Sequence, residues 1–213
     1  MGPKLPGVDL KFLQMENNSP SKSCFLFAVF ANGKQLFEGE LNRAIVNGII
    51  QELTFMQIPY FHVCPELEDI RIGDRVNRAN ENNEQSAFLI SVHANTNEVG
   101  RPGSGCEFLI YPTSSTGAQI ATIFAEEYQR EFPDERLRMG DDGEPFKRRG
   151  NLGILRRTSM PAIITENFFF NNRRETETYL LTREGRNRIV DYHVAAIVRV
   201  LTEVFEEDLE FRD

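Results

Sequence analysis

The sequence of 213 residues is poor in the features that build disulfide frameworks and nucleic-acid interfaces. Its three cysteines, Cys24, Cys64 and Cys106, are widely spaced and odd in number. Because no CxxC pair is present, the sequence indicates neither a disulfide framework nor a cysteine-based zinc site. The net charge of −8 leaves no basic excess to neutralise phosphates, which argues against nucleic acid as the main partner. The basic runs at 147–149 and 156–157 are candidates for a local basic groove.

Long hydrophobic runs are also absent. No stretch approaches the roughly 20 apolar residues that a membrane-spanning helix needs. The apolar segment at 24–30 is too short, and it lacks the basic start and the small-residue cleavage site of a signal peptide. We therefore expect no signal peptide, no membrane span, and a cytoplasmic, reducing compartment at synthesis.

The residues that are present predict a single α/β domain. Hydrophobic residues make up 40% and charged residues 26% of the chain, as in folded globular proteins. Short apolar runs predict strands, and apolar residues spaced three to four apart predict helices. The alternation of the two predicts a mostly parallel, twisted sheet with helices on both faces. The predicted strands are 8–15, 58–65, 87–92, 106–111 and 161–165, and the predicted helices are 38–53, 72–82, 117–132, 175–181 and 182–205.

Two segments lack a regular apolar pattern. Residues 1–33 are predicted to form an irregular, divergent N-terminal segment with a first strand, and residues 34–208 the main body of the one domain. Residues 133–150 are rich in Gly, Asp, Arg and Lys and are predicted to form a long surface loop. Long loops in compact domains often carry functional residues.

Two of the predicted strands end in an ionisable residue followed closely by asparagine. The first leads into His93 and Asn95, and the second into Glu166 and Asn167. Ligands of open α/β sheets bind just beyond the carboxyl ends of the strands. Each residue alone is better explained as a polar strand end that meets water. A His and a Glu together predict a shared site, and a metal with a carboxylate base is the chemistry that suits them.

Three segments together resemble the zinc-dependent N-acetylmuramoyl-L-alanine amidases that cleave bacterial cell walls. The first is a Glu-x-x-x-Asn pattern that opens a helix at 38–42; alone it is weak, because the helix dipole favours acidic residues there anyway. The second combines Arg-x-x-x-Ala-Asn at 75–80 with Ser-x-His-Ala-Asn at 91–95, and this combination is specific. The third is the run 161–169, which contains Glu166. Their order and spacing match over almost the whole chain.

The resemblance implies a role for each of three residues. Glu38 and His93 would be zinc ligands, and Glu166 would be the general base that deprotonates a zinc-bound water and then protonates the leaving amine. It implies Zn2+ as the cofactor, peptidoglycan as the substrate, and the amide between N-acetylmuramic acid and L-alanine as the bond that is cleaved. We expect a monomeric bacterial or phage protein that reaches the cell wall after release or by export.

The chain departs from this family's pattern at the first ligand. Such amidases take a first His from a Gly-rich turn after the first strand, and the equivalent position here falls near Met15, with no His before His62. A thioether is a poor zinc ligand, and two ligands are one short of the usual catalytic three. Glu16 is the nearest candidate substitute. We therefore weigh an amidase of impaired activity against an inactive module that binds cell-wall peptide; a purely structural α/β domain is the weaker third reading.

The remaining histidines and aromatic residues are predicted to be structural. His62 lies in a predicted strand bounded by prolines, and His193 lies on the apolar side of the last helix. Cys64 and Cys106 are expected to behave as small buried hydrophobes. Residues 168–170 are three consecutive phenylalanines, expected in the core or in the wall of a substrate cleft.

Overall fold

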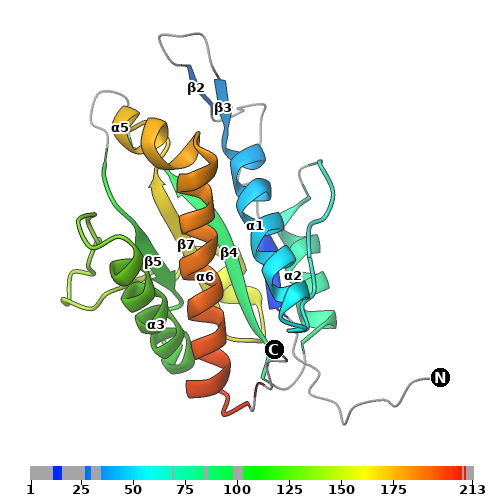
Figure 1. The fold of residues 1–213 in the computed structure, drawn as a ribbon. Coiled ribbons are helices and arrows are strands. Elements are labelled where there is room, and N and C mark those ends of the chain that lie inside the picture. The colour runs from blue at the N-terminus through cyan, green and yellow to red at the C-terminus, as the bar shows by residue number, and fades with distance from the viewer. Residues whose placement is uncertain are drawn as a thin grey trace.

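A computed structural model describes residues 12–15, 27–29, 35–68, 70–83, 86–97, 103–207 and 209. Its centre is a five-stranded sheet with the strand order β1-β4-β7-β5-β6 (Figure 1). The strands are β1 (Phe12–Met15), β4 (Phe88–Asn95), β5 (Glu107–Ile110), β6 (Lys147–Arg148) and β7 (Ala162–Phe169). A separate antiparallel pair is formed by β2 (Phe27–Val29) and β3 (Gln35–Phe37).

The sheet is mostly parallel, as predicted. The pairs β1/β4, β4/β7 and β5/β6 run parallel, whereas β5 runs antiparallel to β7. The long helices are α1 (Glu38–Phe55), α3 (Ser115–Glu131) and α6 (Arg183–Glu203), and the shorter ones are α2 (Ile72–Glu81), α4 (Gly153–Arg157) and α5 (Arg173–Glu175), which continues into the π-helical turn η1 (Thr176–Leu180). Among the described helices, none is long and apolar enough to cross a membrane.

The central strands bury both faces, which explains why they read as continuous apolar runs. Alternate residues of β4 and β7 point to opposite sides. Phe88, Ile90 and Ile163 pack with α1, α3 and α6 in one core cluster. Leu89 and Ile164 pack in a second cluster with residues of α2 and α4. The prediction of helices on both faces is therefore confirmed.

Most predicted helices and strands are confirmed, with shifts at their ends. The predicted strand at 58–65 is wrong, because these residues form irregular structure between α1 and α2. Pro59 and Pro65 cannot donate to a strand ladder, and burial of Ile58 and Val63 beneath the helices accounts for their apolar character. The predicted loop at 133–150 contains the short strand β6, and α4 was not predicted. The part of the first predicted strand before Phe12 lies outside the described residues.

The last helix begins as its sequence predicts. The Thr182 hydroxyl accepts a hydrogen bond from the Gly185 backbone N–H at 3.0 Å, which is an N-cap interaction. From there α6 packs against both α1 and α3 along the sheet. In Figure 1 it lies in front of the sheet, between α3 and α1.

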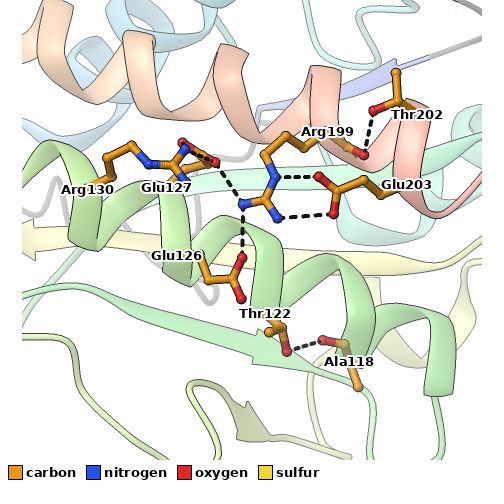
Figure 2. Close-up of polar contacts among 8 residues, drawn as sticks. All are labelled: Ala118, Thr122, Glu126, Glu127, Arg130, Arg199, Thr202 and Glu203. Carbon is orange, nitrogen blue, oxygen red and sulfur yellow. Dashed lines mark hydrogen bonds and ion pairs between the residues drawn. The ribbon is translucent and has the colours of Figure 1, made fainter.

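A cluster of charged residues joins α6 to α3 (Figure 2). Arg199 Nη1 lies 2.8 Å from Glu127 Oε1 and 2.9 Å from Glu126 Oε2 on α3. Its Nε donates to Glu203 Oε1 at 2.6 Å on its own helix. Arg130 also pairs with Glu127. The Glu127 side chain is only 4% exposed, so its charge depends on these two guanidinium groups.

Replacing Arg199 with methionine is expected to lower the free energy of unfolding by about 1–3 kcal/mol, because buried Glu127 keeps only Arg130 as a partner. Chemical denaturation measures this loss. Arg173→Met is the matched control, since Arg173 forms an exposed pair with Glu177 four residues on and should cost below about 0.5 kcal/mol. Equal costs for the two variants would contradict a stabilising role for the α3–α6 cluster.

Candidate active site

The strand order brings His93 and Glu166 together. The Cα atoms of His93 and Glu166 are register partners on the parallel neighbours β4 and β7. Partners in register direct their side chains to the same face, so both belong to one rim of the sheet, as predicted. Both strands continue past the predicted ends, to Asn95 and Phe169, through a shift in pairing after His93.

Glu38 reaches the same rim from the first residue of α1. Its Oε1 lies 3.1 Å from His93 Nδ1, and both side chains are buried. Asn42, one helical turn later, donates from Nδ2 to the same oxygen at 3.3 Å, which gives the Glu-x-x-x-Asn spacing a structural reason. Two ligands that each lie about 2.05 Å from a tetrahedral zinc are about 3.3 Å apart. The Glu38–His93 pair is therefore compatible with two ligands of one metal ion.

The other ring nitrogen of His93 also has a partner. His93 Nε2 lies 3.0 Å from the hydroxyl oxygen of Ser91, two residues earlier on the same face of β4. Ser91 is completely buried, so its hydroxyl is not placed to attack a substrate. It instead fixes the orientation of the imidazole ring.

Glu166 has the proton affinity expected of an acid–base group. Burial raises the pKa of its carboxyl to about 7. Nearby His93 opposes this rise, and the carboxylates of Glu38 and Glu107 add to it. A carboxyl group with a pKa near neutrality can both accept and return a proton at physiological pH.

Glu107 is a member of the rim that was not predicted. It begins β5, and its Cα atom is the register partner of Glu166 across the antiparallel pair. Its carboxylate accepts hydrogen bonds from Arg138 at 2.8 Å, from Asn95 at 3.0 Å and from Lys147. Burial acts to raise the pKa of Glu107, but the bonds to Lys147 and Arg138 outweigh it and the pKa is lowered. Lys147, the first residue of the basic run at 147–149, is therefore neutralised by Glu107.

The rim is held in place by buried polar groups behind it. Asn167 Nδ2 donates to the His93 carbonyl at 2.9 Å, which ties β4 to β7 where their pairing shifts. The buried carboxylate of Glu175 accepts hydrogen bonds from the backbone N–H groups of Gly105 at 2.7 Å and Phe169 at 2.8 Å. Glu175 thereby fixes the chain just before Glu107 and just after Glu166.

The three consecutive phenylalanines lie in the core, as one of the two alternatives predicted. Phe168 has a φ of +63°, which bulky residues rarely adopt and which costs of order 1–3 kcal/mol. Its ring is fully buried and stacks on Tyr179 with 4.4 Å between centroids. This packing stabilises the bend that follows Glu166. The guanidinium carbon of Arg138 lies over the Phe169 ring, 5.0 Å from the ring centroid.

Met15 lies next to the His93 strand. It ends β1, and its Cα atom is the register partner of Val92, the residue before His93. Met15 therefore ends the strand that neighbours β4, one residue short of the level of His93. Glu16 lies outside the described residues. Across the described part of the chain, no three His, Cys, Asp or Glu side chains converge as a metal site would require.

The other histidines and the described cysteines are not part of the rim. His193 is buried on α6, as predicted, and burial lowers its pKa to about 4. His62 is half-buried and lines a separate apolar cavity beside α1, where burial lowers its pKa. Cys64 and Cys106 are buried, which confirms their prediction as small hydrophobes.

Comparison with known sequences identifies related proteins. A family model described as N-acetylmuramoyl-L-alanine amidase matches residues 29–199. The sporulation-specific N-acetylmuramoyl-L-alanine amidase of Bacillus subtilis (strain 168) is 33% identical over 102 residues, which are 48% of this chain and 35% of the relative. The endolysin of Bacillus phage SPP1 is 33% identical over 133 residues, which are 60% of this chain and 44% of the relative. The chain thus spans less than half the length of these curated relatives.

Comparison with solved structures identifies the same fold. The N-acetylmuramoyl-L-alanine amidase AmiC2 of Nostoc punctiforme superposes with a TM-score of 0.74 at 19% identity, covering 92% of this chain and 98% of that one. The amidase Ami1 of Mycobacterium smegmatis superposes with a TM-score of 0.75 at 16% identity, covering 91% and 97%. At these identities the likeness establishes the fold.

Proposed function

This chain belongs to the N-acetylmuramoyl-L-alanine amidase family, and on that premise we propose that it is a peptidoglycan hydrolase of impaired activity. The bond cleaved is the amide between N-acetylmuramic acid and L-alanine. The observation that supports this proposal is the meeting of Glu38, His93 and Glu166 at one rim. The protein acts on bacterial cell walls, which it reaches after release or by export.

Each of the three residues has a defined task in this proposal. Glu38 and His93, whose Oε1 and Nδ1 atoms lie 3.1 Å apart, would be the residues that hold a zinc ion. When bound, zinc lowers the pKa of an attacking water and polarises the scissile carbonyl. Glu166, with a pKa of about 7, would be the group that accepts a proton from the attacking water and returns it to the leaving amine. Glu107 accepts hydrogen bonds from Lys147 and Arg138, which keep its negative charge in place beside Glu166.

One observation favours a second function. Among the described residues no three His, Cys, Asp or Glu side chains converge, whereas a catalytic zinc site normally has three protein ligands. A chain that does not hold zinc would keep the fold and bind cell-wall peptide without cutting it. The two functions differ in metal content and in product release.

Metal analysis of the purified chain, with mass spectrometry of peptides released from bacterial cell walls, separates these functions. For the hydrolase we expect zinc that is lost in His93→Ala and a low yield of peptides that begin with L-alanine. His62→Ala is the control, since His62 lies on a separate cavity and its replacement should leave zinc content unchanged.

Three other outcomes decide against this hydrolase. Wall binding without zinc or released peptide supports the binding module. Zinc retained in His93→Ala places the metal elsewhere. A chain that neither binds nor cleaves cell walls contradicts both functions.

A further inference from the structure

The two ring nitrogens of His93 have partners of different chemistry. Nδ1 faces the Glu38 carboxylate at 3.1 Å, and Nε2 faces the Ser91 hydroxyl at 3.0 Å. An ionised carboxylate only accepts hydrogen bonds, so a neutral His93 without metal carries its proton on Nδ1. Nε2 is then an acceptor, and the Ser91 hydroxyl donates to it.

A metal ion on Nδ1 requires the opposite arrangement. The ligating nitrogen must offer its lone pair, so a neutral ring carries its proton on Nε2. A hydroxyl can accept as well as donate, and rotation about its Cβ–Oγ bond is enough to exchange the two roles. We propose that Ser91 is a positioning residue that stabilises both tautomers of His93, Nδ1–H without metal and Nε2–H with metal. The ring holds one proton in each state. This inference rests on the zinc site of the proposed function.

A second buried histidine, His193 on α6, contacts the same sheet and provides an internal comparison. His193 Nε2 lies 3.0 Å from the Thr165 hydroxyl, while His193 Nδ1 lies 2.7 Å from the Ile189 carbonyl. A carbonyl only accepts, so His193 keeps its proton on Nδ1 and Thr165 always donates. The distance between the hydroxyl oxygen and Nε2 is 3.0 Å in both buried pairs. Under this proposal, however, only the ring bonded to Ser91 changes its tautomer.

Titration with zinc alone tests the proposal. Ser91→Ala is expected to weaken zinc binding about 10–100-fold, because the buried Nε2–H of the metal-bound ring, left without an acceptor, costs more than the unpaired Nε2 lone pair of the metal-free ring. Ser91→Thr keeps a hydroxyl and should bind zinc like the wild type. Thr165→Val removes the equivalent hydroxyl from His193 and should leave zinc affinity unchanged. Thermal unfolding of all three variants reports whether the fold is kept.

Nitrogen-15 NMR of the imidazole rings reads the tautomers directly, and the chain has only three histidines to assign. Zinc should move the proton of His93 from Nδ1 to Nε2 and leave His193 unchanged. A metal-free His93 with its proton on Nε2 overturns the inference. Zinc binding that is indifferent to Ser91→Ala, or equally weakened by Thr165→Val, also overturns it and leaves the zinc site intact. A wild-type chain that takes up no zinc overturns the zinc site of the proposed function as well.

Discussion

Replacing Met15 with histidine is expected to raise the zinc affinity of this chain by more than about 100-fold, the upper end of what a single outer-shell partner contributes to a metal site. The Cα atom of Met15 is the register partner of Val92, directly before His93, so a histidine at this position would lie on the strand next to that of the proposed ligand His93. A third ligand completes the set that catalytic zinc sites normally have. Competition with a chelator of known affinity measures the change.

The same substitution should also produce measurable release of peptides that begin with L-alanine from cell walls. The gain is expected to be partial, because a new histidine also needs a partner for its second ring nitrogen. Glu166→Gln in the Met15→His background should reduce the gained activity by about 10²–10⁴-fold, the usual contribution of a general base. Zinc binding should be retained in that double variant.

Gln14→His is the matched control for this rescue, since it adds an imidazole to the same strand one position from Met15. Equal gains from Gln14→His and Met15→His would mean that a histidine anywhere on β1 recruits the metal. Strong activity of the wild-type chain would mean that another residue already completes the site. If Met15→His gains neither zinc nor activity, the vacant ligand position is not at Met15, and the binding function is favoured.

Patterns that repeat along a helix or fill a strand were enough to predict most of the fold. Apolar residues at every fourth position predicted α1, and the buried runs before His93 and Glu166 predicted the two central strands. The direction of β5 was not predictable, because an apolar run has the same appearance in a parallel and an antiparallel strand. The strand β6 has only two residues, Lys147 and Arg148, and shows no pattern at all.

The parts of the site that were not predicted depend on contacts between distant segments. Glu107 is a single polar residue at a strand start, and only the pairing of β5 with β7 places it beside Glu166. Ser91 lies inside an apolar run, and its role emerges only from its 3.0 Å contact with His93. Residues 58–65 show the opposite error, because burial without strand pairing produces the same apolar composition as a strand.

The second large effect concerns the stability of the fold in acid. His193 is completely buried, and its two ring nitrogens contact the Thr165 hydroxyl and the Ile189 carbonyl. Because Nε2 accepts a hydrogen bond from the Thr165 hydroxyl, a second proton on the ring would remove that bond and place a charge in the core. Burial accordingly lowers the pKa of His193 from 6.5 to about 4.

As the pH falls from 6.5 to 4, the unfolded chain protonates His193 and the folded chain does not, so this residue should lower the free energy of unfolding by about 3 kcal/mol in total. The loss is absent above pH 6.5 and complete near pH 4. Glu166 acts in the opposite sense, because its pKa is raised to about 7 and the folded chain takes up its proton first. The two effects overlap in pH, so the wild-type profile alone does not separate them.

The difference in unfolding free energy between the wild type and His193→Gln isolates the histidine. Glutamine retains a donor and an acceptor but does not titrate. At pH 7 the variant should therefore have a lower free energy of unfolding than the wild type. As the pH approaches 4, the free energy of unfolding of the wild type should fall by about 3 kcal/mol relative to that of the variant. Urea denaturation at several pH values measures this difference. His62→Gln is the control and should change less, because His62 is only half-buried. A difference between the wild type and His193→Gln that does not vary with pH would show that His193 has the same pKa in the folded and the unfolded chain.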